Sequence, residues 1–176
     1  MPQKPLTAIL SFKTKDYLKQ FFENKYGSPL MFEGNIFFEQ VLQALIRNPL
    51  DFQRKHQDLV KRVDTFKSTI DILVVNSRTI DLCTELNERQ TITLNKFFES
   101  LFDDCFIDFC QIHQILGLKI HEIINEFCTV YFTKDGCEIT YQALEKKWYR
   151  HRKSKANFTS QLFEQSIAQI IEPSPH

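Results

Sequence analysis

The sequence predicts a mainly α fold with a two-stranded antiparallel ribbon, built as a pseudo-twofold strand-helix-helix repeat and followed by C-terminal helices. The first observation is a motif, Asn-Ile-Phe-Phe-Glu at residues 35–39, that recurs as Asn-Lys-Phe-Phe-Glu at residues 95–99. Each copy follows an amphipathic segment and, before it, a short apolar run. In addition, 176 residues contain only four glycines and six prolines, which favours long helices over an all-β fold.

Composition limits the class of protein and of partner. The chain is 43% hydrophobic and 25% charged, which is ordinary for a globular protein of one domain, or of one domain with an appendage. Seventeen phenylalanines predict an aromatic-rich core. The formal net charge is zero, so any affinity for nucleic acid has to come from a local patch.

Targeting signals and cysteine usage indicate a cytoplasmic protein without a membrane partner. No stretch reaches the roughly 18 apolar residues of a membrane-spanning helix, and residues 1–5 lack the apolar core of a secretion signal. The five cysteines form no Cys-x-x-Cys pair, and their odd number predicts reduced thiols.

The first strand-helix-helix unit begins with a strand at residues 6–13, where apolar and polar residues alternate. Thr14 is the expected N-cap of a helix over residues 15–26, and Gly27 is its expected stop. A second helix starts at Asn35 and ends before Asn48-Pro49.

The second unit repeats this order less regularly. A strand at residues 69–75 is followed by an N-cap at Ser77, a helix through residues 80–86 and an extended connector at residues 91–94. The longest helix then runs from Asn95 to about Leu116. Chance recurrence of the motif in a Phe-rich chain is the alternative to a true repeat. Between the units, residues 50–66 are highly charged and predict a solvated linker helix, or else a phosphate-contacting surface.

The C-terminal third predicts two more helices. One covers residues 119–132, and the other, capped by Thr140, runs from Tyr141 to about Lys153 after a turn at residues 133–136. The tail from residue 157 onward carries apolar residues at near-helical spacing. We expect it either to dock on the domain as a last helix or to pair with a second subunit in a homodimer. The predicted division is a repeat domain at 6–116, a helical appendage at 117–171 and a disordered tail at 172–176.

The strand-helix-helix order resembles, as a tandem pseudo-dimer, the ribbon-helix-helix family of DNA-binding proteins. In that family an antiparallel ribbon lies in the major groove and the helices form the core. The resemblance implies pairing of Ala8–Phe12 with Ile70–Val74. The groove-facing positions it implies are Thr7, Ser11, Lys13, Thr69 and Asp71, with phosphate contacts at Asn35 and Asn95.

The chain departs from that family on the strand face that would enter the groove. Ile9, Leu73 and Val75 share the face with the polar residues, and Asp71 is repelled by phosphates, although it can accept a hydrogen bond from a cytosine amine. The alternative is a small sheet buried on both faces.

A stronger charge signal lies at residues 141–155, which carry six Lys or Arg against one Glu, a balance of +5. Leu144 and Trp148 lie four residues apart and are expected to anchor this helix. The capped helix with its cationic face resembles the second helix of a helix-turn-helix unit. The expected phosphate-contacting residues are Lys146, Lys147, Arg150, Arg152 and Lys153, interleaved with Tyr149 and His151. A solvated helix end is the alternative.

Sequence patterns for metals, cofactors and catalysis are weak. Cys110 and His113 are one helical turn apart, but with His121, Cys128 and Cys137 they match no zinc spacing. An acidic cluster at Glu99, Asp103, Asp104 and Asp108 fits a solvated helix face better than a magnesium site. Neither a phosphate-binding loop nor a nucleophile motif is present.

The sequence therefore predicts a non-enzymatic DNA-binding protein without cofactor or metal, a regulator or accessory factor of a phage or mobile element. DNA is expected over RNA. The rival is a protein-interaction or structural phage component whose basic helix contacts an acidic partner. A metal-dependent nuclease, a third class, requires the acidic helix to face the basic one.

Overall fold

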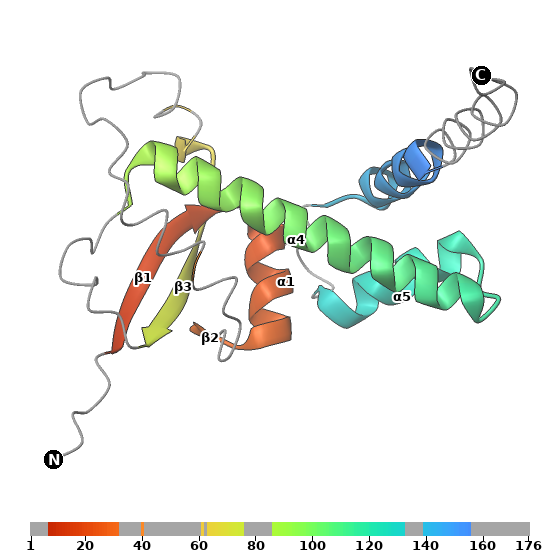
Figure 1. The fold of residues 1–176 in the computed structure, drawn as a ribbon, viewed down its shortest axis with the longest axis horizontal. Coiled ribbons are helices and arrows are strands. Elements are labelled where there is room, and N and C mark those ends of the chain that lie inside the picture. The colour runs from red at the N-terminus through yellow and green to blue at the C-terminus, as the bar shows by residue number, and fades with distance from the viewer. Residues whose placement is uncertain are drawn as a thin grey trace, which may run out of the picture.

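The computed structural model describes residues 7–31, 40, 61, 63–75, 86–132 and 139–155. This part of the chain is mainly helical with one small sheet (Figure 1). Its elements are β1 (Thr7–Thr14), α1 (Asp16–Tyr26), β2 (Leu30–Met31), β3 (Ser68–Val75), α4 (Glu88–Ile115), α5 (Ile120–Tyr131) and a further helical run at residues 141–155. Most of the helix predicted from Asn35, the Ser77 cap, the turn at 133–136 and both tail segments lie outside the described residues.

The two predicted strands pair with each other in the predicted register. β1 and β3 are antiparallel, with Ala8 opposite Val74 and Phe12 opposite Ile70, so this prediction is confirmed. The sheet is not a two-stranded ribbon, however. The short strand β2 pairs with β3 in parallel, which gives a mixed sheet in the order β1-β3-β2. A third strand adds support that a two-stranded ribbon lacks on its own.

One face of the β1–β3 pair is buried and the other is open. Leu10, Phe12, Ile70 and Ile72 belong to the core. The side chains that alternate with them along the strands are exposed, namely Ile9, Ser11, Lys13, Thr69 and Asp71. The predicted alternation on β1 is confirmed, and the alternative of a sheet buried on both faces is wrong.

The first helix starts one residue later than predicted and with a different cap. Lys15 is the N-cap of α1, while Thr14 is the last residue of β1 and its side chain is fully buried. At the other end Gly27 has a φ of 84°. This left-handed conformation suits glycine and ends the helix where the sequence predicted.

The long helix α4 begins well before Asn95, which overturns several predictions for this segment. Asn87 forms a capping box with Gln90: each side chain accepts a 2.9 Å hydrogen bond from the backbone N–H of the other residue. Residues 91–94 are therefore helical rather than an extended connector, and Leu86 lies outside a helix. One continuous helix stands where the repeat required the end of one helix and the start of another. The pseudo-twofold repeat is not supported.

The core is built around a phenylalanine ladder on α4. Phe98, Phe102 and Phe106 are four residues apart and fully buried. Phe98 meets Phe22 of α1 with 4.5 Å between ring centroids, and Phe106 meets Phe127 of α5 at 5.0 Å. Such edge-to-face pairs add to the free energy gained by burial. The same core extends to the helix at 141–155, so it crosses the predicted boundary at residue 116, and that domain division stays a prediction.

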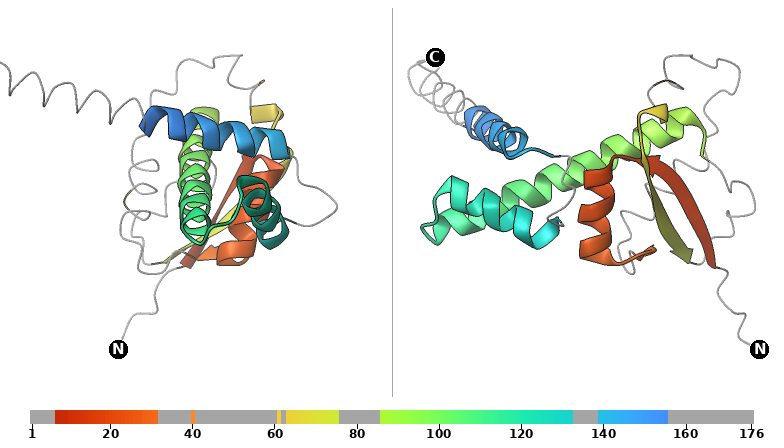
Figure 2. Two further views of the ribbon diagram at one scale, coloured as in Figure 1. Left: turned by 90° about the vertical axis from the view of Figure 1, so that its right-hand side faces the viewer. Right: turned by 180° about the vertical axis from the view of Figure 1, so that it is seen from behind.

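Helix α4 is the central helix of the described structure, and the other elements lie along it. The sheet and α1 lie along its first half, and α5 and the helix at 141–155 lie along its second half (Figures 1 and 2). Helix α5 occupies the predicted place, with Lys119 and Phe132 as its caps. Within the described residues, no helix combines the length and the apolar character needed to cross a membrane.

Candidate nucleic-acid interface

The helix at residues 141–155 is fastened to the core by its predicted anchors. Leu144 is fully buried and Trp148 is 3% exposed. Thr140 caps the helix: its Oγ1 accepts a 3.2 Å hydrogen bond from the backbone N–H of Ala143. The cap and both anchors were predicted from the sequence and are confirmed.

Two polar contacts hold the same helix against α4. The Lys147 ammonium donates to both carboxylate oxygens of Asp103, at 2.6 and 2.8 Å. One turn further on, the His151 ring nitrogen Nε2 lies 3.1 Å from Nε2 of Gln111. Lys147 is thus half-buried and engaged with α4, and a contact from it to phosphate stays a prediction. Neither partner could be found from the sequence, because about forty residues separate each pair.

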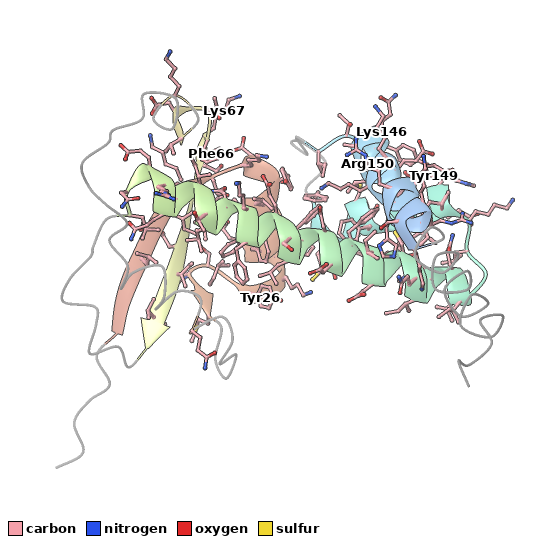
Figure 3. All side chains as sticks on the ribbon, turned by 45° about the horizontal axis from the view of Figure 1, so that its top comes forward. Tyr26, Phe66, Lys67, Lys146, Tyr149 and Arg150 are labelled. Carbon is pink, nitrogen blue, oxygen red and sulfur yellow. The ribbon has the colours of Figure 1, made fainter. Side chains whose placement is uncertain are left out.

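The opposite face of the helix is cationic and open. Figure 3 shows Lys146, Tyr149 and Arg150 together on this helix. Five of the predicted contact residues are exposed, namely Lys146, Tyr149, Arg150, Arg152 and Lys153. We call these five residues the basic face. Among the described residues, no carboxylate forms an ion pair with any of its four cations.

The open face of the sheet has a different electrostatic character. Ser11 Oγ donates a 2.6 Å hydrogen bond to Asp71 Oδ1, and the Lys13 ammonium lies 3.6 Å from Asp64 Oδ1. Lys13 thus has a carboxylate partner, and Asp71 adds a second carboxylate, so this face has no excess of positive charge among these residues. The strand β1, which carries Ser11 and Lys13, lies along the first half of α4, whereas the helix that carries the basic face lies along its second half (Figure 2). The structure thus brings the five residues of the basic face together on the helix at 141–155. It leaves Ser11 and Lys13 on a separate surface.

Asn95 does not occupy the phosphate-contacting position that the family resemblance implied. It lies inside α4 and is 2% exposed. Its Nδ2 donates to the Lys13 carbonyl at 2.8 Å, and its Oδ1 accepts from Thr14 Oγ1 at 2.7 Å. This residue ties the end of β1 to α4 and is not available to a ligand. Asn35 and the side chain of Thr7 lie outside the described residues.

A pocket of about 420 Å³ opens beside the start of the basic helix. Three of its lining residues take part in ion pairs: Lys15 pairs with Glu99, and Lys147 pairs with Asp103. Burial and the nearby carboxylates raise the pKa of Tyr17, whose ring lines the pocket. Sequence reasoning missed this pocket, because its walls come from segments far apart in the chain.

The weak metal and nuclease candidates have structural roles in the described residues. Burial raises the pKa of Cys110 to about 12, so its thiol stays protonated. The His113 ring stacks on Phe109, and its Nδ1 lies 2.8 Å from the Phe109 carbonyl oxygen. The acidic helix does face the basic one, but Asp103 is paired with Lys147 there. Within the described ranges, no three His, Cys, Asp or Glu side chains gather closely enough to hold a metal ion. Cys137 lies outside those ranges.

Comparisons with protein-family models, with curated proteins and with solved structures found no match to this chain.

Proposed function

We propose that the protein is a non-enzymatic DNA-binding protein and that the basic face is its phosphate-contacting surface. One observation carries this proposal: a rigidly anchored helix presents four exposed cations without ion pairs among the described residues, in a chain of zero net charge.

Neutralisation of phosphates is the physical basis of the proposed binding. A cation that contacts a phosphate of duplex DNA releases condensed counterions, and each contact contributes about 0.9 to the slope of log affinity against log salt. Four contacts from the basic face would give a slope of roughly −3.6. This contribution carries no sequence preference, because phosphates are alike at every base.

The anchoring of the helix supports the proposal. Leu144 and Trp148 are buried and fix which side of the helix meets the core, and the Lys147–Asp103 pair adds a polar contact with α4. The cationic side chains therefore project from a backbone that is already ordered. Binding then restricts only the motion of these side chains, which lowers its entropic cost.

A mobility-shift titration of the full chain against random duplex DNA at several salt concentrations tests the proposal. The expected result is binding that weakens steadily as salt rises. An absence of salt-dependent binding to DNA or RNA would reject it. The basic face would then fit an acidic protein partner, a rival testable by ion-exchange chromatography with polyglutamate as the probe.

A further inference from the structure

The basic face contains an aromatic side chain that the core does not use. Tyr149 is 52% exposed, whereas its chain neighbour Trp148 is 3% exposed. Among the described residues, no other ring stacks on the Tyr149 ring and no cation lies over it. About half of the surface of this side chain is therefore available to a ligand.

Other tyrosines of the described chain are used differently. Tyr17 packs edge-on against Phe102 with 5.2 Å between ring centroids. Tyr131 meets Phe127 at 4.8 Å. Tyr26 is partly exposed, but it stacks on Phe22 and lies under the ammonium of Lys25. Tyr141, on the same helix as Tyr149, is partly buried and packs against the core. Tyr149 differs from these four tyrosines because it is exposed and lies among cations.

The cations surround Tyr149 at helical spacing. Lys146 precedes it by three residues, and Arg152 and Lys153 follow it by three and four residues. Residues three or four apart are neighbours on a helix surface, so these positive charges flank the ring on both sides along the helix axis. Glu145, four residues before Tyr149, is the one carboxylate of this helix at the same spacing. Arg150, the next residue, extends the positive charge around the helix, and Figure 3 shows it with Lys146 and Tyr149.

We infer that the basic face binds single-stranded nucleic acid, with Tyr149 as a stacking platform for one base and the flanking cations on the adjacent phosphates. This inference rests on the proposed function and names its ligand class. Single-strand sites combine a positive surface that follows the backbone with aromatic rings on which bases stack. In a duplex the base faces are already covered by their neighbours, so an exposed ring at this place would have no base to stack on.

The inference is tested with the full chain by fluorescence anisotropy at fixed salt. The probes are labelled oligo(dT), oligo(rU) and a random duplex of equal length, about 16 nucleotides, which fits the usual single-strand site sizes. Three variants are compared. Tyr149→Ala removes the ring, Tyr149→Leu keeps only apolar bulk, and Tyr149→Phe keeps the ring without its hydroxyl. Because Tyr149 is exposed, circular dichroism should show an unchanged fold for all three.

The single strands should bind more tightly than the duplex. Tyr149→Ala and Tyr149→Leu should weaken single-strand binding by roughly 5- to 150-fold, the range measured for loss of one stacking partner. Tyr149→Phe should bind like the wild type, and the salt slope should be the same for all variants, because no phosphate contact is removed. Binding of oligo(dT) and oligo(rU) alike would assign the site to single strands of either sugar, and a preference for one would name the natural ligand.

Two results would overturn this inference, and they differ from a failure of the proposed function. If the duplex binds as tightly as the single strands, or if Tyr149→Ala leaves single-strand affinity unchanged, the stacking role is refuted while salt-dependent binding still stands. If none of the three probes binds, the proposed function itself is refuted.

Discussion

The replacement of Asn95 by alanine tests whether the junction between β1 and α4 holds the fold together. Asn95 makes three hydrogen bonds through its amide group, to Thr14 Oγ1 at 2.7 Å, to the Lys13 carbonyl at 2.8 Å and to the Thr91 carbonyl at 2.9 Å. The first two connect residues about eighty positions apart in the sequence.

The expected loss follows from the groups that the variant leaves behind. A buried donor or acceptor without a partner costs about 1–3 kcal/mol, more than the net value of an intact hydrogen bond. Thr14 is fully buried, so water cannot replace the lost partner of its hydroxyl. With the Lys13 carbonyl also deprived of its donor, Asn95→Ala should lower the free energy of unfolding by about 2–4 kcal/mol. Adding Thr14→Val, which removes the orphaned hydroxyl, should recover about 1 kcal/mol of that loss.

Urea denaturation followed by circular dichroism measures these differences. Lys96→Ala is the matched control, because Lys96 is the exposed neighbour in the same helix, and its effect should stay within about 0.5 kcal/mol. A loss below about 1 kcal/mol for Asn95→Ala, or no recovery in the double variant, would show that these hydrogen bonds do not hold β1 to α4.

Three further predictions concern the core and the helix anchor. Phe98→Ala should cost about 3–5 kcal/mol in the same denaturation assay because Phe98 is fully buried, and a cost below about 1 kcal/mol would place it at the periphery. In the folded protein at pH 8, Cys110 should resist a thiol reagent while the partly exposed Cys105 reacts, since burial raises the pKa of Cys110 to about 12; equal labelling of both by mass spectrometry would contradict this. Asp103→Asn should cost under about 1 kcal/mol, because the Lys147–Asp103 pair is partly exposed to screening by solvent, and it should not make the salt slope of binding shallower.

Periodicity predicted the elements whose buried and exposed residues differ clearly. The alternation of side chains along β1 predicted its open and buried faces. The register with β3 was predicted from the strand-helix-helix order and the family resemblance, and the structure has that register. The spacing of Leu144 and Trp148 predicted which side of the basic helix meets the core. The faces of β1 and of the helix at 141–155 are set by local periodicity, so the sequence alone suffices for them.

Long-range contacts account for what the sequence did not predict. Asn95 has a high preference for helix caps, but here tertiary hydrogen bonds to β1 hold it inside a helix. The start of α4 is set by the capping box of Asn87 with Gln90, so residues 91–94 are helical. The sequence prediction missed this cap and assigned those residues to an extended connector. Lys147 looked like any other cation of its helix, and only the fold brings Asp103 within 2.6 Å of it.

The claim that the basic face binds nucleic acid is tested by neutralising its charge and measuring how binding depends on salt. The test variant combines Lys146→Gln, Arg150→Gln and Lys153→Gln. The control variant removes the same charge from exposed lysines elsewhere, through Lys61→Gln, Lys96→Gln and Lys119→Gln. The slope of log affinity against log salt should become shallower by about 2–3 units for the test variant and stay unchanged for the control. An equal change in both variants, or no change in either, would contradict the assignment of the basic face as the binding surface.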